Sequence, residues 1–147
     1  MENSKKKQHF FEWLSAEEMH EHSTRWMSEL KFVKDEQLFL NNLIKSYTLK
    51  LLDTTLFNKS KKLIAELSKA EKEVVRLMKK IQSHENLLEI MINDVDELKM
   101  EKAYLETHRE LSTTIEDYQI NYRNLKSSLF RVITPLMKKD KQKRLLN

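Results

Sequence analysis

Residues 51–60 read LLDTTLFNKS, and this stretch decides how the rest of the chain folds. Before it, apolar residues recur every three or four positions, which is the spacing of one face of an α-helix. Asp53, two threonines and Asn58 interrupt that spacing, and the same pattern resumes after them. We therefore predict a turn at 53–58 that joins two long helices.

Polar residues and one proline predict where the helices begin and end. Ser15 with Glu18, and Asp94 with Glu97, each fit a capping box, in which two residues three positions apart satisfy backbone groups at a helix start. The second box indicates another turn at 93–95. Pro135 has no backbone N–H to donate, so a helix is expected to end near it. The predicted helices cover about residues 16–52, 59–92 and 95–134.

The composition favours helices throughout. The 147 residues include no Gly and a single Pro, whereas tight hairpins in β-sheets depend on glycine. The apolar stripes repeat nearer 3.5 than 3.6 residues, the period of left-handed coiled-coil packing. Three helices of similar length joined by short turns predict an all-α fold, an antiparallel three-helix bundle of long, coiled-coil-like helices in one domain.

The charge surplus is small and lies near the two ends of the chain. There are 27 Lys and Arg against 23 Asp and Glu, and the excess is concentrated in Lys5–Lys7 and in residues 138–144. We expect a flexible basic segment at 1–14 and a basic tail at 135–147. Because the middle is nearly neutral, a nucleic-acid partner is not expected. A basic tail with apolar residues leaves contact with an anionic membrane surface as an alternative.

Several classes of function lack their sequence signals. The chain has no Cys, and no apolar run in it reaches the length that a membrane span needs, so it offers neither a thiolate site nor a candidate span. It has no Gly-rich phosphate loop and no nucleophile elbow. We therefore expect a non-enzymatic cytoplasmic protein.

Ionisable residues on the core stripes form a candidate metal site. Glu29, His84 and His108 fall at about one level when the helices are paired around the predicted turns, with His22 and Glu85 as further candidates. One carboxylate and two imidazoles match the ligands of a divalent transition metal. Histidines at the edge of a bundle also reach solvent without binding anything, so metal binding is an alternative and no cofactor is the main expectation.

The first predicted helix carries more apolar surface than a three-helix core requires. Phe32, Phe39 and Leu43 form a second apolar group, displaced by roughly 100° to 140° from the main stripe. Exposed aromatic residues in a row favour a binding surface, although the ends of the chain could also fold over them. The sequence thus predicts protein–protein interaction or homo-oligomeric assembly, with a metal-binding bundle and membrane contact as alternatives.

Overall fold

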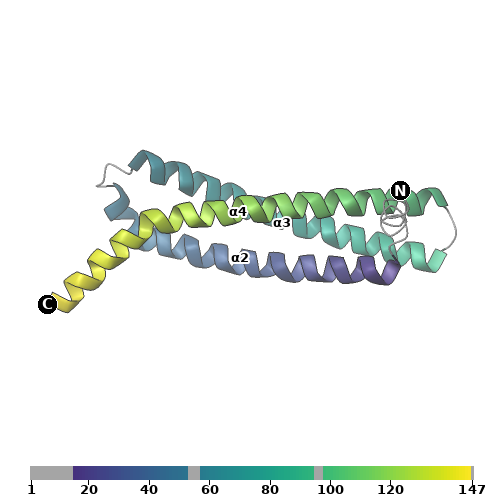
Figure 1. Ribbon diagram of the computed structural model, residues 1–147, viewed down its shortest axis with the longest axis horizontal. Helices are drawn as coiled ribbons and strands as arrows, with labels where there is room; N and C mark the ends of the chain where they lie inside the picture. Colours follow the sequence, from purple (N-terminus) through teal and green to yellow (C-terminus); the bar gives the residue numbers. More distant parts are fainter. Residues whose placement is uncertain (1–14, 53–56, 95–97, 147) are drawn as a thin grey trace, which may run out of the picture. The chain divides into compact units, whose positions relative to one another are not determined.

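The computed structural model describes residues 15–52, 57–94 and 98–146, which hold three α-helices. These are α2 (Ala16–Leu52), α3 (Phe57–Asp94) and α4 (Leu98–Leu146), coloured from purple to yellow in Figure 1. They pack against one another, and the described ranges contain no strand. The predicted all-α three-helix bundle is confirmed, whereas the segment 1–14 lies outside the described residues.

Buried side chains follow a seven-residue repeat in every helix. In α2, the buried residues at this spacing are Met19, Trp26, Val33 and Leu40. In α3, they are Ser60, Leu67, Val74, Ile81 and Leu88. In α4, they are Tyr104, Leu111, Tyr118, Leu125 and Val132. A sustained seven-residue repeat keeps one stripe of each helix facing its neighbours only when the helices supercoil, which is the coiled-coil-like packing the sequence predicts.

The chain divides into two compact units, and each contains a segment of all three helices. Unit 1 consists of Met1–Lys31 with Arg76–Asp117, and unit 2 of Phe32–Val75 with Tyr118–Asn147. Two successive levels of unit 1 are Met19–Leu88–Tyr104 and His22–His84–His108. Residue numbers rise from one level to the next in α2 and α4 but fall in α3, so α3 runs antiparallel to the other two.

The start of α2 agrees with the predicted cap. Ser15 Oγ accepts a hydrogen bond from the Glu18 backbone N–H at 3.1 Å, and the Ser15 carbonyl accepts one from Met19 N–H at 3.0 Å. The Ser15 side chain therefore satisfies one of the backbone donors that a helix start leaves without intrahelical partners, and its carbonyl accepts the first hydrogen bond of the helix. This cap fixes where α2 begins, and with it the positions of all its later side chains.

The end of α4 differs from the prediction. The helix does not stop at Pro135 but continues to Leu146, and its last, yellow stretch runs at an angle to the part before it (Figure 1). Pro135 is exposed, so the carbonyl that it deprives of a hydrogen bond can turn toward water. Beyond it, Leu136 is buried and Asp140 forms an ion pair with Lys50 of α2. These contacts stabilise the final turns as helix, which the local rule for proline does not take into account.

Candidate functional site

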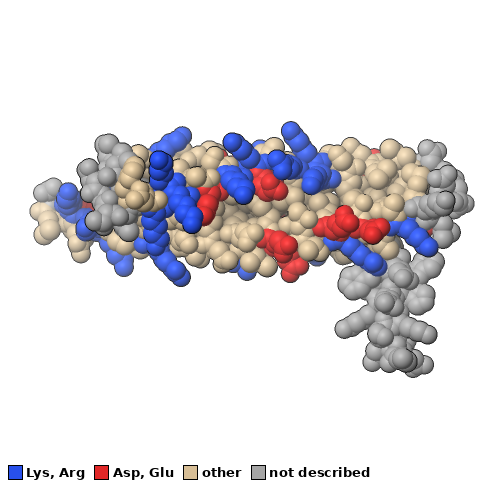
Figure 2. All heavy atoms as spheres, turned by 90° about the horizontal axis from the view of Figure 1, so that it is seen from above, with Lys and Arg blue, Asp and Glu red and all other residues tan. Residues whose placement is uncertain are grey.

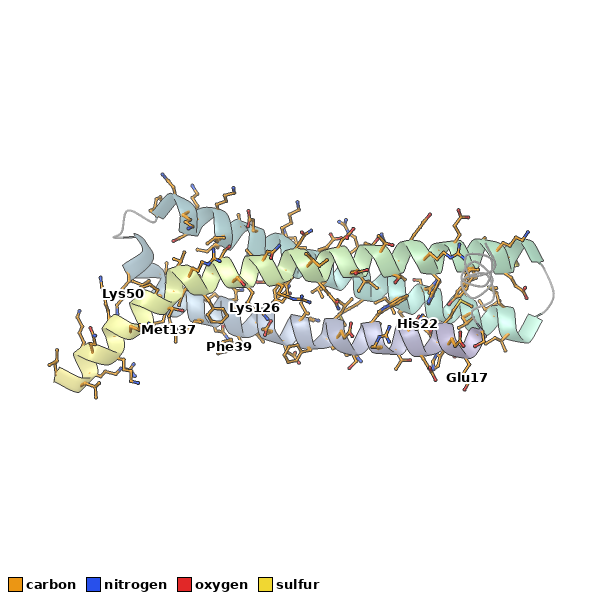
Figure 3. All side chains as sticks on the ribbon, in the orientation of Figure 1. Glu17, His22, Phe39, Lys50, Lys126 and Met137 are labelled. Carbon is orange, nitrogen blue, oxygen red and sulfur yellow. The ribbon has the colours of Figure 1, made fainter. Side chains whose placement is uncertain are left out.

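A layer of three histidines crosses the core of unit 1, and we call it the histidine layer. It consists of His22 from α2, His84 from α3 and His108 from α4, and Figure 3 labels His22. His84 Nε2 lies 2.8 Å from His108 Nδ1, and His108 Nε2 lies 3.1 Å from His22 Nδ1. His84 and His108 are buried on the core-facing sides of their helices, so the helix geometry itself turns both rings inward.

The central histidine of this layer is neutral at physiological pH. Burial, followed by the nearby rings of His84 and His22, lowers the pKa of His108 from 6.5 to about 4. The pKa of His84 is also lowered, chiefly by burial, although the carboxylate of Glu85 acts in the opposite direction. A neutral imidazole has one N–H donor and one acceptor nitrogen, so the hydrogen bonds run through His108 in a single direction.

The buried ring of His84 determines the direction in which these hydrogen bonds run. The described part of the chain offers no hydrogen-bond partner to His84 Nδ1, which is buried. A buried N–H without a partner is rarer than a buried acceptor without one. The favoured arrangement therefore has His84 donating from Nε2 to His108 Nδ1, and His108 donating from Nε2 to His22 Nδ1. The half-buried His22 then accepts at Nδ1.

Aromatic and apolar side chains surround the histidine layer. The Tyr104 ring stacks on His84 with centroids 4.0 Å apart, and the Trp26 ring lies 4.7 Å from His108. Burial, with a smaller contribution from Glu85, raises the pKa of Tyr104, so its hydroxyl stays protonated. The histidine layer thus links all three helices of unit 1, with His84 and His108 buried among aromatic rings.

The residues proposed as metal ligands separate into two environments. His22, His84 and His108 come together, as described above. Glu29 lies outside this group: its side chain is 44% exposed and pairs with Arg25 at 3.9 Å along α2. Glu85 is half-buried and its Oε2 lies 2.5 Å from Nδ1 of the exposed His20. Within the described ranges, no three His, Asp or Glu side chains are placed to hold one metal ion.

A shallow hollow on unit 1 belongs to α2 alone. Its lining residues are His20, Glu21, Thr24, Arg25, Ser28 and Glu29. Because all six lie on one face of one helix, the hollow is a surface depression rather than a cleft between helices. Two carboxylates line it, those of Glu21 and Glu29.

A second candidate site is an apolar surface on unit 2, formed by α2 and α4. It comprises Phe32, Phe39 and Leu43 of α2 with Phe130 and Met137 of α4, and we call it the apolar surface. Counting about 100° per residue, the three α2 residues lie within about 40° of one another on the helix. Phe32 is 65% exposed and Phe39 is 58% exposed, whereas Leu43 is half-buried. The structure therefore places the predicted aromatic group on the outside of the bundle.

Contacts between α2 and α4 show that the two parts of the apolar surface adjoin. Glu36 Oε1 accepts hydrogen bonds from the Tyr122 hydroxyl at 2.7 Å and from Lys126 Nζ at 2.9 Å. Glu36 is three residues before Phe39, and Lys126 is four residues before Phe130, so each is a surface neighbour of its phenylalanine. Figure 3 labels Phe39, Lys50, Lys126 and Met137 where α2 and α4 run beside each other.

Charge is unevenly divided between the two units. Unit 1 contains 11 Lys and Arg and 16 Asp and Glu, a net charge of −5. Unit 2 contains 16 Lys and Arg and 7 Asp and Glu, a net charge of +9. On the face shown in Figure 2, blue side chains gather over unit 2, near the end with the C-terminus. Unit 2 holds both the lysines of residues 59–72 and the basic end of α4, which the linear sequence separates.

Sequence reasoning missed several residues of these sites. Phe130 and Met137 lie seven residues apart on α4, the same spacing as Phe32 and Phe39 on α2. This seven-residue spacing is the sequence pattern that could have identified them. Ser23 and Gln37 are buried on the core-facing side of α2, where their spacing from Trp26, Leu30 and Leu40 points to them despite their polar side chains. A search for apolar periodicity alone overlooks such residues.

None of the helices in the described ranges is long and apolar enough to cross a membrane. A comparison of the chain with protein-family models, with curated proteins and with solved structures gave no match.

Proposed function

We propose that this chain acts by protein–protein contact through the apolar surface of unit 2, as an assembly protein rather than a catalyst. The observation that carries the proposal is the exposure of Phe32 and Phe39, two aromatic residues one above the other on the outer side of α2. Burying a phenylalanine side chain stabilises a protein by about 1.5–3 kcal/mol. A partner that covers both rings therefore gains a substantial part of its binding energy from them.

The core of unit 2 is filled by side chains other than these two phenylalanine rings. Leu40 and Leu67 are essentially inaccessible to solvent, and Leu125 and Leu129 fill the same interior from α4. The apolar surface is therefore additional to the core, and it continues across α2 and α4 around the Glu36–Lys126 contact. Binding surfaces with an apolar centre and a polar rim have this composition.

Charge substitution in the apolar surface tests the proposal. We expect the wild-type chain to migrate, in an extract of the cell that produces it, with a mass larger than one chain. Phe39→Glu should reduce that mass to a single chain, because a carboxylate in an apolar contact is desolvated and unpaired. The matched control is Ile90→Glu, which introduces the same charge at a similarly exposed apolar residue of α3, outside the apolar surface.

Two results would contradict the proposal. One is a wild-type chain that migrates as a single chain both in the extract and after purification. The other is an Ile90→Glu variant that loses its assembly as completely as Phe39→Glu. Helical circular dichroism of both variants should match the wild type, which separates loss of contact from loss of fold.

A further inference from the structure

We infer that the last turns of α4, residues 138–146, form a contact site for the surface of an anionic phospholipid membrane. These residues belong to unit 2 but lie outside the apolar surface. The inference therefore goes beyond the proposed function and does not rest on it.

Basic residues dominate this part of α4. Residues 138–146 read KKDKQKRLL, with five Lys and Arg and a single acidic residue, Asp140. Asp140 forms an ion pair with Lys50 of α2, so its carboxylate already has a cation beside it. Within the described ranges, no ion pair involves Lys138, Lys139 or Lys141. An anionic lipid surface attracts such a cluster, because its negative potential acts on every Lys and Arg close to it.

Two lysines and one leucine lie on the side of this segment that faces away from α2. The buried Leu136 and the ion-paired Asp140 mark the side that faces the rest of unit 2. Counting about 100° per residue, Lys138, Lys141 and Leu145 lie roughly 120° to 180° around the helix from that side. All three are exposed. A flat surface can therefore approach this side of α4 without displacing a contact inside unit 2.

The apolar residues beside the cations favour a membrane over other anionic partners. Leu145 is 76% exposed and Leu146 is 86% exposed, the highest values among the large apolar side chains that the structure describes. The phosphates of a nucleic acid attract cations but offer no apolar phase to a leucine. A bilayer offers both, since leucine side chains enter the boundary of the acyl chains while lysine side chains extend back to the headgroups.

The direction of this segment suits such a contact. The last stretch of α4 runs at an angle to the part before it (Figure 1). All of residues 141–146 are exposed. The segment can thus lie along a membrane surface while Leu136 and Asp140 keep it attached to unit 2.

Vesicle binding by the full chain tests the inference. The purified chain is mixed with vesicles of phosphatidylcholine alone, or of equal parts phosphatidylcholine and phosphatidylglycerol, and the bound fraction is measured by flotation. We expect binding to the anionic vesicles only. Raising the ionic strength from about 0.1 M to about 1 M should release the chain, because the Debye length falls from about 10 Å to about 3 Å.

Paired lysine substitutions locate the contact. Lys138→Gln with Lys141→Gln should weaken partition into the anionic vesicles by about 25-fold, since each lysine near such a surface contributes a factor of about five. The matched control is Lys69→Gln with Lys72→Gln, which removes the same charge from two exposed lysines of α3 in unit 2, at the same spacing. The control should bind like the wild type.

A leucine pair tests the apolar part of the contact. Leu145→Ser with Leu146→Ser should weaken partition by about tenfold, because serine gains little from entering the acyl boundary. Helical circular dichroism of every variant should match the wild type, which separates loss of contact from loss of fold.

Three results would overturn the inference. The first is a wild-type chain that does not bind the anionic vesicles. The second is a Lys69 and Lys72 control that loses as much binding as the Lys138 and Lys141 pair, which would make net charge alone responsible. The third is a leucine pair that binds vesicles like the wild type while a duplex DNA oligonucleotide binds with the same lysine dependence, which would identify a nucleic acid as the partner.

Discussion

His84 and His108 lie with Nε2 and Nδ1 2.8 Å apart at the centre of unit 1, and the same His108 ring approaches His22 on its other side. Unit 2 contains a corresponding polar bridge: Gln37 Nε2 donates to the Tyr118 hydroxyl at 2.8 Å. That hydroxyl donates to the Ala70 carbonyl at 2.7 Å. Each unit thus has a polar layer that joins all three helices. Such layers disfavour misaligned pairings of helices, because a shifted register leaves their polar atoms buried without partners.

The histidine layer makes stability depend on pH in a defined window. The pKa of His108 is lowered from 6.5 to about 4 in the folded chain, so the unfolded chain binds the proton more tightly. The stability that this shift contributes is therefore fully present above pH 6.5 and is lost as the pH falls toward 4. The lowered pKa of His84 acts in the same direction. The His108 shift corresponds to about 3 kcal/mol at its full extent.

Urea denaturation of wild type and His108→Gln from pH 7.5 to pH 4 measures this effect. Protonation of carboxylates contributes below pH 5 in both chains, so the informative quantity is the difference between the two free energies of unfolding. The difference should shrink as the pH falls, because glutamine does not titrate. A difference that is the same at pH 7.5 and pH 4.5 would show that His108 does not supply the dependence.

Zinc tests the metal hypothesis on the same residues. An ion shared by His84 and His108 would need about 2.0–2.1 Å to each nitrogen and would replace their direct hydrogen bond. Both nitrogens of His108 already lie within hydrogen-bond distance of other imidazoles, in opposite directions. We therefore expect the same melting temperature at pH 7.5 with chelator and with stoichiometric zinc. A zinc-dependent rise that disappears in the double variant His84→Ala, His108→Ala would instead establish a metal site.

The fold was predictable because its signal is local and repeated. The spacing of residues such as Trp26, Val33 and Leu40 identifies the buried stripe of α2, and His84 and His108 lie on the corresponding stripes of α3 and α4. Ring-to-ring distances were not predictable, because they depend on the relative rotation of neighbouring helices. Pairing the predicted helices around the predicted turns showed only that His84 and His108 lie at about the same level along the bundle.

Glu29 shows where angular reasoning loses precision. Glu29 directly precedes the buried Leu30. A small error in the angle assigned to Glu29 around the axis of α2 therefore decides whether its side chain is predicted to lie in the core or on the surface. A long carboxylate at such a flanking position extends outward, where Arg25 one turn earlier pairs with it. The division of charge between the units could not be predicted from the sequence either, because the two segments of unit 2 are separated along the chain by a segment of unit 1.

Replacement of Pro135 tests why α4 continues past it. A proline inside a helix costs about 3 kcal/mol relative to alanine, so Pro135→Ala should stabilise the turns that follow it. Native-state hydrogen exchange should become slower at residues 136–146, whereas exchange in α2 at Trp26 should be unchanged. An unaltered exchange rate at residues 136–146 would mean that Leu136 and the Lys50–Asp140 pair already hold this segment as firmly as the rest of the helix.

A double-mutant cycle on Gln37 and Tyr118 measures the strength of the polar bridge in unit 2. Burial raises the pKa of Tyr118 to about 12, so the hydroxyl is protonated and acts both as acceptor and as donor. Tyr118→Phe leaves the Gln37 amide N–H buried without its acceptor and should lower the free energy of unfolding by about 1–3 kcal/mol. Gln37→Leu removes that orphaned donor, so the double variant should be more stable than the sum of the single losses implies, with a coupling of about 0.5–3 kcal/mol.

The control for this cycle is Tyr47→Phe, which removes a hydroxyl from a half-buried tyrosine elsewhere in unit 2. It should show no coupling to Gln37→Leu, because the two side chains share no hydrogen bond in the described structure. Strictly additive losses for Gln37→Leu and Tyr118→Phe in urea denaturation would show that the 2.8 Å contact adds no stability beyond the two side chains taken separately.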